Sequence, residues 1–575
     1  MRTMRIHRRR IRAAAITAIC IMAGLAIYLA YVMIFCSAEL SAKAEALHQR
    51  ERVIKAPRGR IISRDGTVLT DNRTVCTVSV IHSQVKDPEK VIEVLTSELE
   101  MSKERVRKYV EKVSSMEKVK SNVSKEVGDR IREYNLSGVK VDEDSRRTYP
   151  FDELASKVIG FTGADNQGIV GLEARYDSVL SGTNGMILTY TDAAGRQLEN
   201  EKEERVLPVP GDDLYVSIDY NIQSYCEQAA MKAYEAKQAK SVSIIVMNPQ
   251  NGEIYAMVNY PEYNLNDPYT LNYEISEPLS EDEKMTLLNA MWRNGAINDT
   301  YEPGSTFKVV TATAGIDCKA VSLSDSYCCG GSITVGGRTI RCHKNTGHGQ
   351  QTFAQTIQNS CNPAFITWGL RIGTERFLEY MERLGLLEKT GVDLPGEAGT
   401  IMHKKENIKE LELATMSFGQ SFQITPLQLM RAVSCAINGG KLITPHFGVK
   451  TIGADGTVSE LSYSSEENVL EPSTCDTMKK LLESVVSEGG GHNCRIDGYS
   501  IGGKTATSQK LPRSAQKYIA SFIGFAPAND PQVMAMCIID EPQGVYYGGT
   551  IAAPVIREVF ENILPYLNIE KSENN

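Results

Sequence analysis

The sequence is organised around Tyr301-Glu302-Pro303-Gly304-Ser305-Thr306-Phe307-Lys308-Val309-Val310. Pro303 and Gly304 interrupt the preceding segment and apolar residues follow at helical spacing, so the sequence predicts a helix that opens at Ser305. Lys308 lies one turn further along the same helix face. A serine hydroxyl is a weak nucleophile until a base removes its proton, and a lysine amine kept partly neutral by burial can be that base. The pair is therefore a candidate nucleophile and base.

The spacing Ser-x-x-Lys is weak evidence by itself, because it also describes a helix start with an exposed lysine. It recurs in three charged stretches, at Ser83/Lys86, Ser115/Lys118 and Ser137/Lys140. The Pro-Gly turn, the apolar helix and two further motifs downstream distinguish the pair at residues 305 and 308. Those motifs decide whether the pair is a site.

The second motif lies about 55 residues further on, within residues 358–365. Ser360 and Asn362 are two residues apart in a predicted loop between helices, so a hydroxyl and a carboxamide can point into one cleft. Ser360 could relay protons from Lys308, and Asn362 could bind a substrate amide. The alternative is a polar helix cap.

The third motif has two candidates. A literal Lys-Thr-Gly occurs at residues 389–391, but the Val-Asp-Leu-Pro-Gly-Glu that follows is typical of a loop. Residues 502–507 instead precede a predicted strand at 518–526, so they can form an edge strand that borders a cleft. We choose the second candidate. Its site residues are Lys504, Thr505, Ala506 and Thr507.

The chain begins with six arginines and no acid in its first twelve residues, and residues 13–35 carry no charged side chain. An apolar run of this length can cross a bilayer as a helix, and the arginines keep its N-terminal end in the cytoplasm. The alternative is a cleaved signal peptide with a small-x-small site at residues 42–44, but the run is long for one. The formal charge of −8 leaves about −14 beyond the arginines, which argues against a nucleic-acid partner.

Thirteen cysteines are scattered along the chain, and one cluster stands out. It comprises Cys328, Cys329, Cys342, His343 and His348, beside the glycines of a predicted hairpin. Since no Cys-x-x-Cys pair is present, the sequence favours a disulfide or packed thiols over zinc. We expect no metal and no cofactor.

The order of the predicted elements indicates an α+β fold. Residues 38–52 are predicted to continue the membrane helix, strands follow within 56–69 and 75–81, and amphipathic helices fill 87–134. A boundary near residue 210 precedes a strand, a helix and a hairpin whose turn is Asn248-Pro249-Gln250-Asn251-Gly252. A long helical region, two more strands and a closing helix at 553–564 complete the chain.

At this point the chain resembles the class B penicillin-binding proteins, the serine D,D-transpeptidases of peptidoglycan synthesis. Their signature is Ser-x-x-Lys, Ser-x-Asn and Lys-Thr-Gly in that order, which is similar to Ser305/Lys308, Ser360/Asn362 and Lys504/Thr505. The resemblance extends from the membrane helix to about Leu564. Further similar stretches are residues 58–61, 171–173, 302–308, 390–397, 419–420, 425–428, 524–527 and 552–554.

The resemblance implies an acyl-enzyme mechanism. Ser305 would attack the penultimate D-Ala carbonyl of a stem peptide or a β-lactam, with Lys308 as base, Ser360 as proton shuttle and Asn362 as peptide ligand. Lys504 and Thr505 would receive the terminal carboxylate, and the N–H groups of Ser305 and Thr507 would form the oxyanion hole. Ala506 replaces the family's glycine, so its methyl group is expected to crowd the substrate.

The resemblance also implies the domain organisation. We expect a cytoplasmic tail at 1–12, a transmembrane helix at 13–35, a pedestal or dimerisation-type domain at 36–210, a transpeptidase domain at 211–566 and a polar tail at 567–575. The transpeptidase domain should combine an antiparallel sheet flanked by helices with an all-helical subdomain. The pedestal is too short and too unlike a glycosyltransferase domain, so a separate membrane glycosyltransferase of the shape-elongation-division-sporulation type is the expected partner.

Two other functions fit the same motifs. One is a β-lactam-binding sensor or hydrolase, which would need a cytoplasmic signalling domain or a deacylating water base. The other is a scaffold of the cell-wall machinery whose catalytic site is impaired by Ala506.

Overall fold

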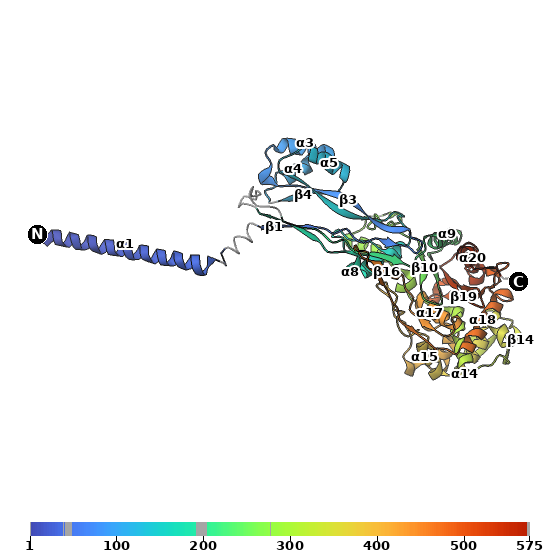
Figure 1. Cartoon of the computed structure of the whole chain (residues 1–575). Helices are drawn as coiled ribbons and strands as arrows, with labels where there is room; N and C mark the ends of the chain where they lie inside the picture. The colour runs from blue at the N-terminus through green and yellow to red at the C-terminus, as the bar shows by residue number, and fades with distance from the viewer. Residues whose placement is uncertain are drawn as a thin grey trace. The chain divides into compact units, whose positions relative to one another are not determined.

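The computed structural model describes residues 2–37, 39–40, 49–114, 116–190, 204–276 and 278–571 (Figure 1). Its first element is the helix α1 (Arg2–Phe35). Within the part from Ile6 to Phe35, an 18-residue window has a mean hydropathy of 2.4, and this part is long and apolar enough to cross a bilayer. The chain beyond α1 contributes to two compact units, each built from separate segments.

The first unit comprises residues 1–57, 73–146 and 183–209. Its small core packs amphipathic helices on strands through buried aliphatic side chains such as Val78, Ile92 and Leu95. A separate three-stranded antiparallel sheet has the order β1-β6-β7. The elements that lie in this unit are β1 (Gln49–Ile54), the later part of β3 (Val68–Val80), the 3₁₀ turn η1 (His82–Gln84), α3 (Pro88–Leu99), α4 (Lys103–Val110), β4 (Glu117–Ser124), α5 (Lys125–Glu133), most of β5 (Val139–Thr148), β6 (Gly185–Tyr190) and β7 (Glu204–Val206).

Three sequence predictions for this region are wrong. Residues 49–54 form the strand β1 and do not continue the membrane helix; the proposed cleavage site at 42–44 lies outside the described residues. Two strands do flank the turn within 56–69, but the second of them and the strand expected at 75–81 are one strand, because β3 runs unbroken from Val68 to Val80. The stretch expected to be wholly helical contains β4, whose buried Val119 and Val123 face the core while its lysines face solvent.

The second unit comprises residues 58–72, 147–182 and 210–575, and a five-stranded antiparallel sheet organises it. The strand order is β10-β9-β21-β20-β19, so β19 is an edge strand. The strands are β9 (Ser241–Met247), β10 (Ile254–Tyr260), β19 (Gly502–Gln509), β20 (Tyr518–Ala526) and β21 (Val533–Asp540). The predicted antiparallel sheet is confirmed.

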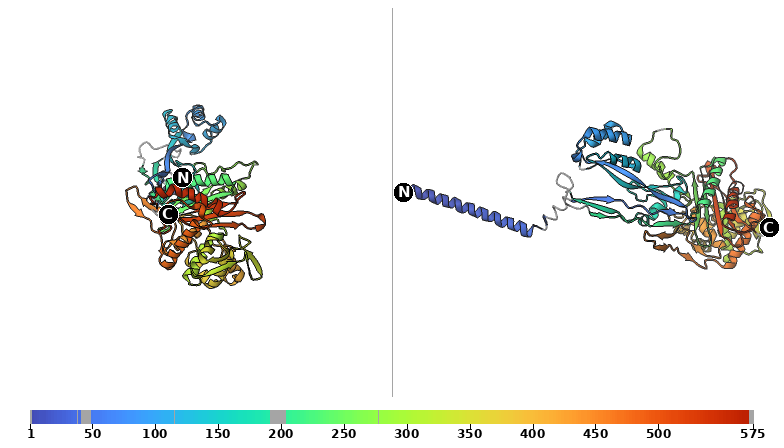
Figure 2. Two further views of the ribbon diagram at one scale, coloured as in Figure 1. Left: turned by 90° about the vertical axis from the view of Figure 1, so that its right-hand side faces the viewer. Right: turned by 45° about the horizontal axis from the view of Figure 1, so that its top comes forward.

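Both faces of this sheet are covered, which explains why its strands other than β19 are mostly apolar. Along β9, Val242, Ile244 and Val246 join a core with the helices α9 (Tyr220–Lys237) and α20 (Ala553–Tyr566). Ile245 and Met247 join the core on the opposite face. This is the period-two alternation of a strand with a hydrophobic layer on each side. Figure 2 shows the helical part of the unit, yellow to olive, to one side of the red strands.

The helical part carries Ser305, Lys308, Ser360 and Asn362, the candidates of the first two motifs. Its helices are α10 (Glu281–Met291), α11 (Gly295–Asn298), the 3₁₀ turn η2 (Gly304–Phe307), α12 (Lys308–Asp317), α13 (Phe353–Gln358), α14 (Asn362–Ile372), α15 (Thr374–Arg383), η3 (Lys405–Asn407), α16 (Glu410–Met416), α17 (Pro426–Ile437) and α18 (Pro472–Ser487). Between α12 and α13 lie two small antiparallel pairs, formed by β11 (Ser326–Cys329) with β14 (Gly349–Thr352) and by β12 (Ser332–Val335) with β13 (Arg338–Arg341). The subdomain is therefore mainly, not wholly, helical.

The remaining elements of the second unit are short. They are β2 (Ile61–Ile62), the first part of β3, the last two residues of β5, α6 (Ser156–Ile159), α7 (Gly171–Arg175), α8 (Asp177–Leu180), β8 (Asp213–Val216), β15 (Leu442–Ile443), β16 (Gly448–Ile452), β17 (Val458–Glu460), β18 (Ser465–Glu466), η4 (His492–Cys494), η5 (Arg513–Ala515) and α19 (Gly548–Ile551).

A buried ion-pair network explains two of the stretches that carried the family resemblance. Glu173 at α7 is fully buried, and its two carboxylate oxygens each lie 2.6 Å from an arginine Nε, one of Arg58 and one of Arg147. Arg58 also donates to Asp177 at 2.7 Å. Both arginines are almost wholly buried as well. A buried carboxylate with two guanidinium partners is costly to break, because removing one side leaves unpaired charge in the interior.

Candidate active site

Ser305 lies in the 3₁₀ turn η2, immediately before α12, and is partly exposed to solvent. The predicted helix start is therefore tighter than an α-helical turn. Gly304 has φ +57°, and a Cβ built on it would lie 2.7 Å from the Ser508 Oγ of β19. Only glycine fits both the backbone conformation and this close approach. The turn therefore places Gly304, the residue before Ser305, directly beside the edge strand β19.

Glu302 anchors the approach to this turn. Its carboxylate accepts the backbone N–H of Ser421 at 2.9 Å and a hydrogen bond from Arg513 at 2.9 Å. Tyr301 forms a backbone bridge with Ile424 on the same side. These contacts hold the residues that lead into the Pro-Gly turn in place.

Lys308 is 1% exposed, and its Nζ has three oxygen neighbours. It lies 2.7 Å from the Ser360 carbonyl, 3.1 Å from the Ser360 Oγ and 2.7 Å from the Asn362 Oδ1. The structure therefore brings the first two motifs together, although they are about 50 residues apart. Burial lowers the pKa of Lys308 from 10.5 to about 7, against the opposing influence of the Cys361 and Cys342 thiols.

Ser360 lies in the turn between α13 and α14, and Asn362 is the first residue of α14. Ser360 has φ +49°, which is uncommon for a residue other than glycine. Such backbone persists where the surroundings hold it in place, and it is frequent at functional sites. The polar-cap interpretation fails for Ser360, since its side chain faces Lys308 and α14 has no side-chain cap.

β19 supplies the third motif from the edge of the sheet, as the sequence predicted. Lys504 and Ala506 lie on its buried face, while Thr505 and Thr507 lie on the half-buried face. Burial, and secondly the charge of Lys308, lower the pKa of Lys504 well below its usual range. Lys308 and Lys504 are therefore close enough to interact electrostatically. The third motif thus lies in the same site as the first two.

The residues after α18 and β21 complete the surroundings of β19. The Thr507 hydroxyl accepts the N–H of Gly548 at 3.1 Å. A Cβ on Gly549 would lie 3.3 Å from the Thr505 Cγ2, and one on Gly490 would lie 3.8 Å from the Thr505 Oγ1. Sequence reasoning missed these glycines as neighbours of the site; the Gly548-Gly549 and Gly489-Gly490-Gly491 runs were the available signal.

The literal Lys-Thr-Gly at residues 389–391 has a structural role. It begins a loop in which Asp393 accepts the N–H groups of Phe447 and Gly448 at 2.8 and 2.7 Å. Glu397 closes the same loop by accepting the Thr390 N–H at 2.7 Å. The loop is not part of a described strand.

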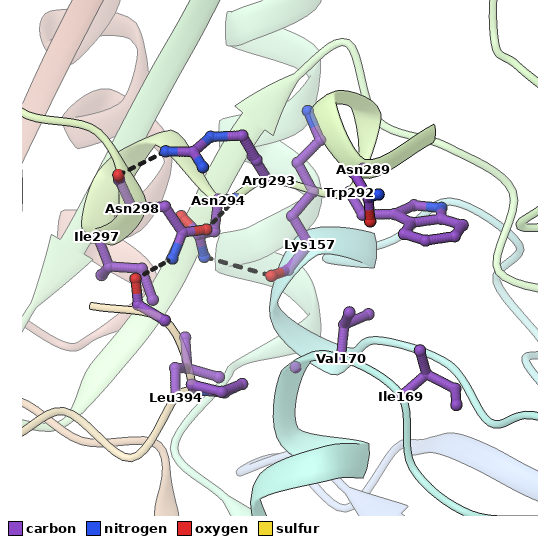
Figure 3. Close-up of a pocket in the computed structure, with 13 residues that line it drawn as sticks. Lys157, Ile169, Val170, Asn289, Trp292, Arg293, Asn294, Ile297, Asn298 and Leu394 are labelled. Carbon is purple, nitrogen blue, oxygen red and sulfur yellow. Dashed lines mark hydrogen bonds between the residues drawn. The ribbon is translucent and has the colours of Figure 1, made fainter. Parts of the chain in front are cut away.

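A pocket of about 300 Å³ lies elsewhere in the second unit (Figure 3). Lys157, Trp292 and Asn298 are among the residues that line it, together with residues 394–396 of the loop just described. Figure 3 shows Asn294 bonded to the Lys157 carbonyl, so polar side chains here bind the protein's own backbone. None of the eight candidate site residues is among the residues that line this pocket.

Comparison with known proteins agrees with this architecture. A family model described as the penicillin binding protein transpeptidase domain matches residues 242–561, and one described as the penicillin-binding protein dimerisation domain matches residues 53–216. The chain therefore belongs to the penicillin-binding proteins. Since it carries both of these domains, it is a class B member of that family.

Two curated relatives and one solved structure illustrate the similarity. The chain is 37% identical over 556 residues to stage V sporulation protein D of Bacillus subtilis (strain 168), covering 95% of this chain and 84% of that protein. It is 30% identical over 459 residues to peptidoglycan D,D-transpeptidase FtsI of Escherichia coli (strain K12), covering 78% and 72%. A peptidoglycan synthetase structure from Bifidobacterium adolescentis shares the fold, with a TM-score of 0.74 at 21% identity, covering 92% and 98%.

Proposed function

We propose that this protein is a serine-type peptidoglycan D,D-transpeptidase that cross-links stem peptides and is covalently acylated by β-lactams. The observation that carries the proposal is the contact of a buried lysine, one turn after Ser305, with both polar residues of the second motif. Relatives named as peptidoglycan D,D-transpeptidases support the same reaction.

In the proposed acylation step, Ser305 attacks the penultimate D-Ala carbonyl. Lys308 accepts the hydroxyl proton as its neutral amine, a form favoured by its lowered pKa. The proton passes through Ser360 to the departing amine, so that free D-Ala leaves and an ester to Ser305 remains. Asn362 holds the peptide amide while it also binds Lys308.

The proposed substrate contacts lie along β19. Lys504 and Thr505 bind the terminal carboxylate of the stem peptide or the β-lactam, and the N–H groups of Ser305 and Thr507 stabilise the oxyanion. An amine of a second stem peptide then attacks the ester, which restores the Ser305 hydroxyl and forms the cross-link. No step in this sequence calls for a cofactor.

Ala506 is the point at which this site departs from its family. Its methyl group is buried on the Lys504 face of β19, with 3% exposure. An added methyl group at this position therefore changes the packing next to Lys504. The scaffold alternative assumes that this change impairs catalysis. Dependence of growth on Ser305 itself would contradict the scaffold alternative.

We propose the following organisation from the sequence and the two matched domains. Residues 1–12 are cytoplasmic, 13–35 span the membrane, 36–210 form the pedestal, 211–566 form the extracytoplasmic transpeptidase domain and 567–575 are a polar tail. The chain would act with a separate membrane glycosyltransferase of the shape-elongation-division-sporulation type, because the matched domains include no polymerase.

The proposed reaction is tested with a thioester mimic of the stem peptide and a D-amino-acid acceptor. The solubilised full chain should release the thiol and form the exchanged product, and Ser305→Ala should form neither. Lys441→Arg is the control, because this lysine pairs with Glu467 outside the motifs. Equal turnover by Ser305→Ala would overturn the assignment of the nucleophile.

A further inference from the structure

Three cysteines and a histidine converge beside the second motif. Cys329 ends β11, Cys342 directly follows β13, His348 directly precedes β14 and Cys361 directly precedes α14. Their ligand atoms all lie within 4.8 Å of one another. The three thiols are buried and the histidine is half-buried. All thirteen cysteines are among the described residues and each is a free thiol, so of the two expected arrangements, a disulfide or packed thiols, the structure has packed thiols.

The separations match the size of a tetrahedral metal centre. Zinc–sulfur bonds of about 2.3 Å place two sulfur ligands of a tetrahedron about 3.8 Å apart, and a sulfur and a nitrogen ligand slightly closer. The Cys342 Sγ already lies 3.6 Å from the His348 Nδ1. No two of the four ligand atoms are more than 4.8 Å apart. Each of these distances therefore has to shorten by about 1 Å at most to reach tetrahedral geometry.

Tight backbone turns hold these ligands in place. Gly331 accepts the Cys342 N–H at 2.9 Å, which ties the end of β13 to the turn after β11. A Cβ on Gly347, where φ is +80°, would lie 2.2 Å from the Cys329 carbonyl oxygen. Since only glycine permits that approach, the turn before His348 is built to pack against Cys329.

We propose that Cys329, Cys342, His348 and Cys361 bind one zinc ion. Three thiolates and one imidazole are the ligands that zinc prefers in closed structural sites, and a complete set of four leaves no open position for catalysis. The sequence favoured no metal because the chain lacks a Cys-x-x-Cys pair. The fold instead draws Cys361 into the group from the second motif, where sequence reasoning had not counted it.

The position of Cys361 connects this centre to the catalytic candidates. Its neighbours on either side, Ser360 and Asn362, are the two residues that contact the Lys308 Nζ. Asn362 also donates to the carbonyl of Arg341, next to Cys342, at 3.4 Å. Zinc would therefore hold the turn that contains Ser360 in its uncommon backbone conformation. This consequence rests on the proposed function, whereas the metal site itself does not.

Metal analysis of the detergent-solubilised full chain tests the site. After purification with zinc and removal of free metal, we expect one zinc per chain, falling at least tenfold in Cys329→Ser and in Cys342→Ser. Cys328→Ser and Cys318→Ser are matched controls and should retain one zinc, because these two cysteines lie outside the group. Less than a tenth of a zinc in the wild-type chain, or equal loss in the controls, would overturn the proposal.

Two measurements on the unmodified chain avoid the question of whether variants fold. Exchange with cobalt should produce the absorption bands of a tetrahedral thiolate site. Alkylation of the denatured chain without reductant should label all thirteen cysteines, since zinc keeps its ligands as thiolates. A disulfide among the three clustered cysteines, or the spectrum of cobalt bound only by oxygen ligands, would overturn the zinc assignment.

The rate of acylation by penicillin tests whether the metal site supports the active site. Removing the metal should slow acylation by penicillin at least tenfold, and adding zinc back should restore the rate. Full acylation by the metal-free chain would overturn the link to Ser360 and Asn362. Absence of acylation in the zinc-loaded chain would instead count against the proposed function, so the two failures are distinguishable.

Discussion

The pH dependence of acylation follows directly from the environment of Lys308. An amine with a pKa of 10.5 is neutral about 0.03% of the time at pH 7, whereas one with a pKa of about 7 is neutral about half of the time. Burial therefore raises the population of the basic form more than a thousandfold. The titratable neighbours of this amine are Lys504, whose own pKa is lowered by burial, and the cysteines Cys361 and Cys342.

The assay is the second-order rate of acylation by a fluorescent penicillin between pH 5.5 and 9. The sign follows from the lowered pKa: below pH 7 the amine is protonated, so the rate should fall about tenfold per pH unit, and above pH 7 it should level off. Lys308→Arg keeps the positive charge but cannot deprotonate, so it should be slow by about a thousandfold and insensitive to pH.

The control is Lys441→Arg, a surface lysine paired with Glu467, which should reproduce the wild-type profile. A wild-type rate that does not change across the range would refute the role of Lys308 as the base. So would a rate that still rises about tenfold per pH unit up to pH 9, because it would mean that burial does not lower the pKa of the Lys308 amine.

Three other substitutions test separate parts of the account. Gly304→Ala should destabilise the second unit by about 1–3 kcal/mol and slow acylation, because the new Cβ would have φ +57° and lie 2.7 Å from the Ser508 Oγ. Glu173→Gln should lower the free energy of unfolding in urea by about 3–5 kcal/mol, because it leaves two buried arginines without their shared carboxylate. Ala506→Gly should raise the acylation rate by up to about tenfold, equivalent to ~1.4 kcal/mol, by removing a buried methyl group beside Lys504.

Each of these has a matched control. Gly399→Ala places its Cβ in open space, Glu253→Gln breaks a partly exposed pair with Arg64, and Ala454→Gly changes an exposed position. The first two should change stability by about 1 kcal/mol or less. Equal effects in test and control, for either stability or acylation, would contradict the structural reason given for that substitution.

Local patterns in the sequence predict much of the second unit. The turn at residues 248–252 and the apolar runs beside it are typical of a hairpin, and the structure has β9 and β10 there. Two segments are candidates for the third motif. Residues 502–507 are followed by a predicted partner strand, whereas residues 389–391 are followed by a loop that contains Pro-Gly, so the sequence favours residues 502–507. Both are short-range signals, and the structure has β19 and a loop at these places.

Long-range packing accounts for what the sequence did not predict. β4 lies in a stretch so rich in lysine that its two buried valines do not outweigh the helical pattern around it. Cys361 is about 30 residues from Cys329, and only the packing of α14 beside the small hairpins brings it to the other thiols. Spacing rules for metal ligands describe local loops, so they cannot detect a site assembled in this way.

The central claim is that Ser305 is a nucleophile activated by Lys308. Intact-protein mass spectrometry after incubation with a penicillin tests it most directly. We expect the wild-type chain to gain the mass of one penicillin and Ser305→Ala to gain none. An adduct of the same mass on Ser305→Ala would contradict the assignment, and so would an unmodified wild-type chain that also fails to react with the thioester mimic.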